Sequence, residues 1–354
     1  MKAIAITDPK NPRSLQLEDA PVPQLGSGEV LIKVTAAGVN RADLVQAAGK
    51  YPAPEGESDI IGLECSGVIE DPGTTGRTRG EAVGCLLAGG GYAEYVAVPE
   101  GQLMPKPDNL SMVELAGVVE VACTVWSNLG MLAGIREGSK VLIHGGSGGI
   151  GSFAIQLCKA LGCEVATTAG SKRKLKYCRE LGADVAINYR EQNFADELKG
   201  WADVILDVVG GPYLEPNVKA LAVDGQIVVI ALQGGPKGEI SLGRMMPRRQ
   251  SLHATTLRAR PRPMKADIVR STIEHVWPLL EAGKIAPNIT ATFPLARAAE
   301  AHELMDSGDN VGKIVLEVSS PGLPRPGGWA RGSCQRGHRA GQQQHVSLRI
   351  ERAE

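Results

Sequence analysis

The chain has 354 residues, of which 43% are hydrophobic and 22% are charged, and its 38 Lys and Arg residues nearly balance 39 Asp and Glu residues. This length exceeds the ~150 residues of an average domain, and the balanced charge excludes a global field that would attract nucleic acid or an acidic membrane. The seven cysteines form no C-x-x-C pair, and neither a spanning apolar run nor a signal-peptide pattern is present. We therefore expect a cytosolic protein with reduced thiols.

Residues 1–121 carry short strand-like runs that are separated by turns rich in Gly and Pro. The runs lie at 1–6, 30–34, 60–69 and 95–98. Several short strands with this punctuation predict a compact β-rich domain over residues 1–121.

From residue 122 onward, short apolar runs alternate with helical stretches. The runs lie at 141–144, 165–168, 185–187, 204–206 and 227–230. Such alternation predicts βαβ units, and hence an α/β fold with a doubly wound parallel sheet over residues 122–264. A helix at 264–282 and a strand at 313–318 are expected to return the segment 265–318 to the first domain.

The last segment, 319–354, changes in character. It is rich in Gly and Arg and includes a run of three glutamines at 342–344. Because it has too few apolar residues to offset the entropy of ordering, we expect a disordered tail. An incidental extension is the preferred interpretation, and a nucleic-acid-binding arm is the alternative.

A glycine motif marks the start of the doubly wound segment. The residues fit G-x-G-x-x-G, follow a predicted strand and open a predicted helix, which is the context that gives this pattern its meaning. Its glycines permit a tight turn, and backbone N–H groups at the helix N-terminus favour a pyrophosphate. We expect the dinucleotide to bind here, at Gly146, Ser147, Gly148, Gly149, Ile150 and Gly151.

The next strand distinguishes the two nicotinamide cofactors. A site for NAD usually carries Asp or Glu about 20 residues after the motif, where the carboxylate binds both ribose hydroxyls. Gly170 stands near that distance, followed by Ser171 and three cations at 172–174. Hydroxyl and cationic groups hold a 2′-phosphate, which an acid would repel. The missing acid therefore favours NADPH, and the cations also fit a solvated helix face.

Four segments carry a resemblance to a known family. They lie at 38–44, 62–64, 89–96 and 310–316. With them, residues 1–318 resemble the zinc-independent quinone oxidoreductases of the medium-chain dehydrogenase/reductase superfamily. The resemblance implies a GroES-like β domain joined to a Rossmann domain, with the cofactor in the cleft between them.

The resemblance also bears on zinc. Zinc-dependent relatives place a Cys where Asn40 stands and a His where Leu63 stands, and they carry a lobe with four closely spaced cysteines that this sequence lacks. Glu64 and Glu120 remain, but two carboxylates without thiolate or imidazole make a poor zinc site. We therefore expect no metal.

Without a Lewis acid, the acceptor must be electrophilic enough to accept hydride from the nicotinamide with only hydrogen-bond donors nearby to stabilise the developing oxyanion. The resemblance implies three active-site residues, of which Asn40 and Tyr51 can donate hydrogen bonds and Asp43 orients its neighbours. It places Thr124 and Ala231-Leu232 beside the nicotinamide. The remaining cofactor contacts that it implies are Gly170, Ser171 and Lys174 at the 2′-phosphate, Tyr189 at the adenine ribose and Lys313 at the cofactor edge.

Three functions stay open at this stage. The first is NADPH-dependent reduction of quinones, and the second is NADPH-dependent reduction of an activated C=C bond in enoyl or alkenal substrates. The third is an NADPH-binding sensor or RNA-associated protein with little turnover, although the set Asn40, Asp43 and Tyr51 favours an enzyme that has a small electrophile, and no nucleic acid, as its partner. The resemblance further implies a homodimer, or a pair of dimers, that pairs through an edge strand at 251–257.

Overall fold

The computed structural model describes residues 1–8, 10–11 and 13–318. The tail expected to be disordered, 319–354, lies outside the described residues. The strands of the described residues form three sheets, which have two, six and seven strands.

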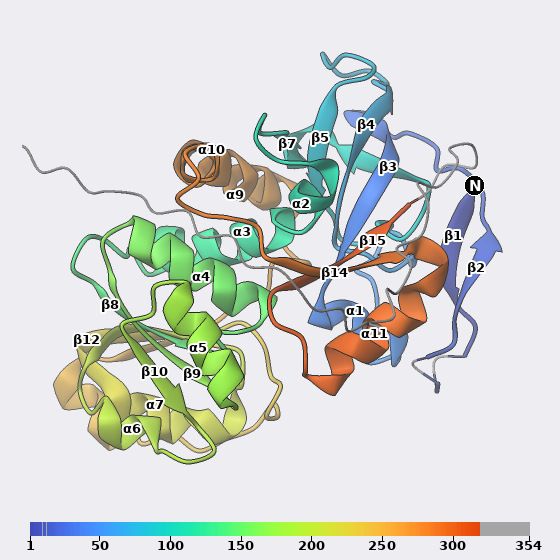
Figure 1. Cartoon of the computed structure of the whole chain (residues 1–354). Helices are drawn as coiled ribbons and strands as arrows, with labels where there is room; N and C mark the ends of the chain where they lie inside the picture. The colour runs from blue at the N-terminus through green and yellow to red at the C-terminus, as the bar shows by residue number, and fades with distance from the viewer. Residues whose placement is uncertain (9, 12, 319–354) are drawn as a thin grey trace, which may run out of the picture. The chain divides into compact units, whose positions relative to one another are not determined.

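The seven-stranded sheet joins the first part of the chain to its end. Its order is β14-β15-β3-β4-β5-β7, with β6 paired to β3. Figure 1 shows the red β15 beside the blue β3, to which it is antiparallel, so residues 313–317 belong to the same sheet as β3. The strands are β3 (Glu29–Val39), β4 (Glu64–Asp71), β5 (Ala82–Leu86), β6 (Tyr95–Pro99), β7 (Leu103–Pro105), β14 (Ile289–Pro294) and β15 (Lys313–Glu317), beside a separate hairpin of β1 (Lys2–Ile6) and β2 (Leu15–Asp19).

The six-stranded sheet confirms the predicted doubly wound α/β fold. Its strands are all parallel, in the order β10-β9-β8-β11-β12-β13. Strand order reverses at β8, and such a switch point is where open α/β sheets bind ligands. The strands are β8 (Lys140–His144), β9 (Glu164–Ala169), β10 (Val185–Asn188), β11 (Ala202–Asp207), β12 (Leu221–Val229) and β13 (Ser251–Ala254).

Helices cover both faces of this sheet because its strands are apolar on both. Successive side chains of a strand point to opposite faces, so Val141 and Ile143 join one core cluster and Leu142 joins another. The first cluster contains residues of α3 (Val119–Val125), α4 (Gly149–Ala160), α5 (Lys172–Glu180) and α9 (Arg262–His275). The second contains residues of α6 (Phe194–Glu197) and α7 (Leu214–Ala220). Full burial of one such side chain stabilises the fold by about 1.5–3 kcal/mol.

The remaining helices are short. They are α1 (Arg41–Ala47), α2 (Met112–Ala116), α8 (Leu242–Met245), α10 (Trp277–Glu281) and α11 (Ala298–Ser307). The first of them, α1, follows β3 directly and places its first residues between the two large sheets, next to the pockets described below.

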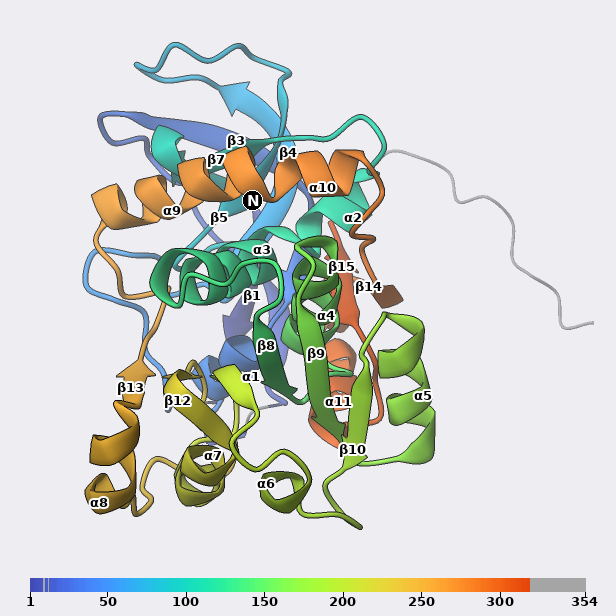
Figure 2. The ribbon, with the colours of Figure 1, turned by 90° about the vertical axis from the view of Figure 1, so that its left-hand side faces the viewer.

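Three predicted elements differ from the structure. The single helix expected at 264–282 is two helices, α9 and α10, which Figure 2 shows in orange one after the other. Pro278, in the first turn of α10, has no backbone N–H to continue an α-helical hydrogen-bond ladder. The edge strand expected at 251–257 ends at Ala254. The strand expected from residue 60 begins only at Glu64, because Gly62 has φ +113 and packs on the backbone of Gly91.

Burial accounts for the described cysteines and for His144. Six cysteines fall among the described residues, and all are free and buried, including Cys65 and Cys123. His144 is also buried, between Thr168 and Asn217, to both of which its ring is hydrogen-bonded. Within the described part of the chain, no helix has the length and apolarity needed to cross a bilayer.

We propose domain boundaries at residues 121, 264 and 318. The strands of the six-stranded sheet all lie within 122–264, and those of the seven-stranded sheet lie within 1–121 and 265–318.

Candidate active site

The larger of two neighbouring pockets, here called the cofactor pocket, lies at the carboxyl ends of β8 and β9. It has a cavity volume of about 440 Å³. Most of the sequence-predicted cofactor residues line it: Ser147, Gly148, Gly149, Ile150, Gly151, Gly170, Ser171, Lys174, Tyr189 and Lys313. Asn40, which was predicted as an active-site residue, lines it as well. The β-strand ends, the turn and the start of α4 therefore form one concave surface.

The glycine turn shows why three of its residues lack side chains. Gly145, just before the motif, has φ +70, which an L side chain rarely adopts. A Cβ on Gly151 would lie 2.4 Å from the Gly145 oxygen, and one on Gly146 would lie 2.0 Å from Thr167 Oγ1. Gly146 and Gly151 therefore let the turn pack against β9 and α4. Gly148 is the N-cap of α4 and lines the pocket itself, so a helix N-terminus that favours an anion opens there.

The end of β9 carries the features that bear on the ribose. A Cβ on Gly170 would lie 2.5 Å from the Tyr189 hydroxyl oxygen, so the acid of an NAD site has no room here without movement of Tyr189. Lys174 and Arg190 line the same end of the pocket. Partial burial and the charge of the nearby Arg173 lower the pKa of Lys174. The site thus has two cations and no carboxylate at the position of residue 170.

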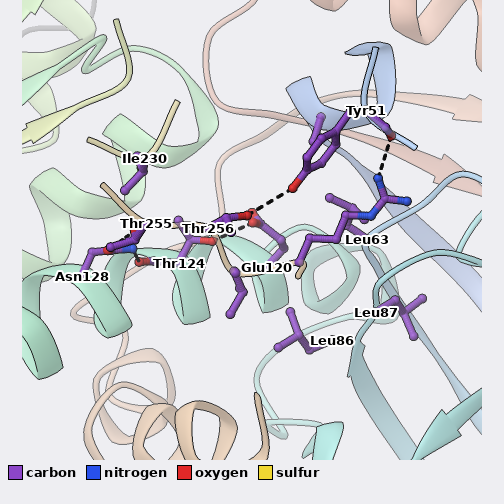
Figure 3. Close-up of a pocket in the computed structure, with 13 residues that line it drawn as sticks. Tyr51, Leu63, Leu86, Leu87, Glu120, Thr124, Asn128, Ile230, Thr255 and Thr256 are labelled. Carbon is purple, nitrogen blue, oxygen red and sulfur yellow. Dashed lines mark hydrogen bonds between the residues drawn. The ribbon is translucent and has the colours of Figure 1, made fainter. Parts of the chain in front are cut away.

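The smaller pocket, here called the acceptor pocket, adjoins the first across the start of α3. Glu120 lines the acceptor pocket and Val121 lines the cofactor pocket. The acceptor pocket has a volume of about 100 Å³ and an apolar wall that includes Leu63, Leu86 and Leu87, while Ile230 and Leu257 line other parts of it. Polar residues also line it: Tyr51, Glu120, Thr124, Asn128, Thr255, Thr256 and Arg258. Figure 3 shows the Tyr51 hydroxyl pointing toward Thr256 and Glu120.

Two contacts hold the Tyr51 side chain in place, one at its hydroxyl group and one on the face of its ring. Its hydroxyl is 3.1 Å from Thr256 Oγ1, and the guanidinium of Arg258 lies over its ring, 4.9 Å from the centroid. Arg258 is only 4% exposed and donates to the carbonyl oxygens of Ala88 and Tyr51 and to Gln46 Oε1. Among the described residues, no carboxylate lies within ion-pair distance of it. The positive charge of Arg258 is therefore compensated by backbone and amide oxygens around the Tyr51 loop.

A buried charge network lies beneath the two pockets. Glu64 is 0% exposed, and its Oε1 accepts from Lys313 Nζ at 2.6 Å and from Asn40 Nδ2 at 2.9 Å. Lys313 Nζ also donates to Asn40 Oδ1 at 2.7 Å and to the Val39 oxygen at 3.3 Å. All three ammonium hydrogens thus have partners. Asn40 keeps one amide N–H free of the network, and its side chain lines the cofactor pocket.

Asp43 occupies a second buried chain, behind Asn40. Its Oδ2 accepts from the Asn40 backbone N–H at 2.8 Å and from the Tyr92 hydroxyl at 3.1 Å. Tyr92 is in turn 3.1 Å from His302 Nε2. Burial raises the pKa of Asp43 to about 7 and lowers that of His302 to about 4. Asp43 lines neither pocket, and its link to the cofactor pocket is the hydrogen bond from the Asn40 backbone.

The structure distributes the other predicted residues unevenly. Thr124 lies in the acceptor pocket, where its hydroxyl donates to Glu120 Oε1 at 2.6 Å. Ala231, Leu232 and Gly146 line neither pocket, and Leu232 is 53% exposed. Lys313 lines the cofactor pocket, but its ammonium points into the Glu64 network.

Three residues of the pockets escaped the sequence-based prediction. Arg190 was adjacent to the predicted Tyr189 and could have been found from that position. Glu120 was considered only as a metal ligand and Arg258 was given no role, because neither belongs to a spaced motif. Within the described residues, no three His, Cys, Asp or Glu side chains are grouped to hold a metal ion.

Comparisons with known proteins agree with both sheets. The family model described as alcohol dehydrogenase GroES-like domain matches residues 26–108, which contain β3 to β7. The model described as zinc-binding dehydrogenase matches residues 181–316, which contain β10 to β15 except its last residue. The quinone oxidoreductase of Rattus norvegicus is 30% identical over 329 residues, which make up 89% of this chain and 97% of the rat protein.

Other relatives differ in size and in cofactor. Phthioceranic/hydroxyphthioceranic acid synthase of Mycobacterium tuberculosis is 30% identical over 305 residues, or 84% of this chain, but the chain spans only 14% of that synthase. The quinone oxidoreductase of Thermus thermophilus, also solved with NADPH, is 30% identical with a TM-score of 0.76, covering 90% of this chain and 100% of that one. An NAD-dependent alcohol dehydrogenase, with the same identity and coverage, has a TM-score of 0.79.

Proposed function

The chain belongs to the quinone oxidoreductase family of the medium-chain dehydrogenases/reductases, and on that basis we propose that it reduces quinones with NADPH and without zinc. Family membership makes the protein an oxidoreductase that uses a nicotinamide cofactor. The observation that carries the finer proposal is the pair of adjoining pockets, one built on a glycine turn and the other lined by hydrogen-bond donors and an apolar wall.

The cofactor pocket fits a dinucleotide with a 2′-phosphate. Any side chain at Gly170 would collide with Tyr189, and a Cβ on Gly149 would lie 2.6 Å from Lys313 Cδ, so the cradle depends on bare backbone. Ser171, Lys174 and Arg190 supply a hydroxyl and two cations for the phosphate. NADPH bound there supplies the hydride. The residues of the chain bind it, exclude water and orient the acceptor.

The acceptor pocket supports reduction without a metal. The two positions that hold zinc ligands in zinc-dependent relatives are Asn40 and Leu63, and neither an amide nor an alkyl group is a zinc ligand of the usual type. Negative charge that develops on an acceptor oxygen must then be stabilised by hydrogen bonds. Tyr51 can donate one from its hydroxyl, and the apolar wall excludes water around it, which strengthens that bond.

A panel of acceptors tests the proposal. Steady-state oxidation of NADPH would be followed with a substituted benzoquinone, a naphthoquinone and an alkenal, before and after treatment with a zinc chelator. We expect the highest kcat/KM with a quinone and no loss with the chelator. A higher kcat/KM with the alkenal would replace quinones by activated C=C bonds as the substrate class. Stoichiometric zinc with chelator-sensitive activity would contradict the metal-free mechanism, and RNA binding without turnover would contradict an enzyme.

A further inference from the structure

One carboxyl group in the acceptor pocket has no role in the function proposed so far. Glu120 Oε1 accepts the Thr124 hydroxyl at 2.6 Å, and the Glu120 backbone N–H donates to Glu64 Oε2 at 2.8 Å. The other carboxyl oxygen, Oε2, has no hydrogen-bond partner among the described residues, and it is not sealed inside the protein. Because Glu120 lines the acceptor pocket, this oxygen faces the space where an acceptor would lie.

The surroundings of Glu120 oppose its ionisation. Burial raises the pKa of its carboxyl group, and the charge of Glu64 on β4 raises it further. Lys313 on β15 and the Thr124 hydroxyl on α3 act in the opposite direction and are weaker. Lys313 already serves Glu64, Asn40 and Val39. The carboxyl group therefore holds its proton to a higher pH than an exposed glutamate does.

We propose that Glu120 is the proton donor of the reduction, giving its Oε2 proton to the acceptor oxygen as hydride arrives. This inference rests on the proposed function. NADPH loses a hydride and becomes NADP⁺, the acceptor gains that hydride and the Glu120 proton, and a quinone becomes a hydroquinone. Glu120 is left as a carboxylate, which takes a proton from water once product leaves. The overall balance is NADPH, quinone and one proton in, and NADP⁺ and hydroquinone out.

The other groups in the acceptor pocket are less suited to this step. Three side chains that line it are titratable: Tyr51, Glu120 and Arg258. The Arg258 guanidinium does not release a proton at ordinary pH and is engaged with backbone oxygens. The Tyr51 hydroxyl lies beside Thr256, where it can donate a hydrogen bond to the acceptor. In Figure 3, Glu120 and Thr124 lie together on the side of the pocket toward which that hydroxyl points.

The first test compares pH profiles of kcat/KM for quinone reduction. A general acid acts in its protonated form, so wild-type activity should fall as the pH rises through the pKa of Glu120. The isosteric variant E120Q keeps an oxygen that can accept from Thr124 but has no proton to give. We expect the kcat/KM of E120Q to be about 100-fold below that of wild type at the low-pH plateau, and its pH profile to lack the descending limb. The matched control E120D keeps a carboxylic acid and should keep the limb at a reduced rate.

A second test separates a proton donor from a structural residue. The solvent deuterium isotope effect on kcat should be normal in wild type and diminished in E120Q. Across a series of quinones, the loss caused by E120Q should shrink as the hydroquinone product becomes more acidic, because such a product oxygen needs its proton less in the transition state. Y51F should instead reduce kcat/KM at every pH and retain the limb.

A third readout does not depend on turnover. The infrared difference spectrum between wild type and E120Q, recorded without acceptor at a pH on the low-pH plateau of the activity profile, should contain the carbonyl stretch of a protonated carboxylic acid. A carboxylate band in its place, or an E120Q variant with an unchanged pH profile and isotope effect, would overturn the proposal while quinone reduction itself stands. Absence of NADPH oxidation by quinones in the wild-type protein would instead overturn the proposed function.

Discussion

The cofactor pocket and the acceptor pocket are built in different ways. The cofactor pocket is built on the glycine turn at 145–151 and the strand end at 169–174, and the segment 305–313 closes another part of it. The acceptor pocket combines side chains from α1, the loop at 51, β5, α3 and the segment after β13. The first site is centred on a glycine turn whose backbone lines the pocket, and the second has no such turn and depends on side chains that meet only in the folded chain.

This difference predicts different responses to substitution. A binding surface formed by backbone atoms should keep its structure when nearby side chains are replaced, except at glycines where a Cβ atom would collide with a neighbour. A buried network of charges is intolerant, because removal of one partner leaves the other charged, buried and unpaired. Substitutions in the buried network beneath the two pockets should therefore cost more stability than substitutions of the less buried cations around the cofactor pocket, Lys174 and Arg190.

Lys313→Met should break this comparison most visibly. Methionine keeps the side-chain stem that passes Gly149 but removes the ammonium that pairs with the fully buried Glu64. We expect the free energy of unfolding to fall by about 3–5 kcal/mol, measured by urea unfolding at pH 7.

The double variant K313M/E64Q is the control for that experiment. It removes both charges and should recover a large part of the lost stability, because glutamine needs no counter-charge. A K313M protein as stable as wild type would show that the network does not stabilise the fold.

Asp43→Asn tests the second buried chain through its pH dependence. The pKa of Asp43 is raised from 3.8 to about 7, so the stability that its neutral form contributes is fully present below pH 3.8 and is lost as the pH rises through 7. By linkage, the fully ionised form costs the folded state about 4 kcal/mol.

Replacement by Asn removes this titration and can keep an oxygen for Asn40 and Tyr92. Relative to wild type, D43N should therefore gain stability between pH 4 and pH 8, as followed by urea unfolding across that range. Parallel stability curves for the two proteins would show that Asp43 is already ionised at pH 4.

Arg258→Met sharpens the comparison on the acceptor side. Loss of the guanidinium frees the Tyr51 loop from its contacts with Gln46 and Ala88, so we expect kcat/KM for quinones to fall about tenfold, or ~1.4 kcal/mol. The Kd for NADPH should stay near its wild-type value, since Arg258 does not line the cofactor pocket. In the double variant R258M/Y51F, the loss of kcat/KM should be smaller than the sum of the two single losses in free energy, because both changes act on the Tyr51 hydroxyl. Strictly additive losses would show that Arg258 does not act through Tyr51.

The smallest effect concerns assembly. We propose a homodimer that pairs through β13, which is an edge strand of the six-stranded sheet with Leu252 40% exposed. Unpaired edges are usually covered in native proteins. Ala254→Pro should weaken the dimer with little effect on the monomer fold. Light scattering of the wild-type protein that shows a monomer at micromolar concentration would contradict this assembly.

How far the sequence predicted the molecule follows the same division. The doubly wound sheet and the glycine turn could be predicted because their signals are local: alternating apolar runs, and glycines at fixed spacing. The break between α9 and α10 was missed because the apolar pattern continues through Pro278, although proline is the residue that interrupts the helix.

The acceptor side was predicted less well for a physical reason. Asn40, Glu64, Glu120 and Lys313 lie far apart in the chain, and no spacing announces that they share one network. The resemblance to a family pointed to Asn40 and Tyr51, of which the first lines the cofactor pocket and the second the acceptor pocket. It placed Asp43 in the site without showing that it lies behind Asn40, and it gave no role to Arg258.

The most direct test of the account is the relative affinity for the two nicotinamide cofactors, measured by fluorescence titration. The central claim is that a pocket with Lys174 and Arg190, and with no room for an acid at Gly170, selects NADPH. We predict that NADPH binds at least ~10-fold tighter than NADH, a difference of about 1.4 kcal/mol, and that K174A/R190A removes most of this preference by weakening NADPH alone. Equal affinities of the wild-type protein for NADPH and NADH would contradict this claim. A double variant that binds both cofactors more weakly by the same factor would contradict it as well.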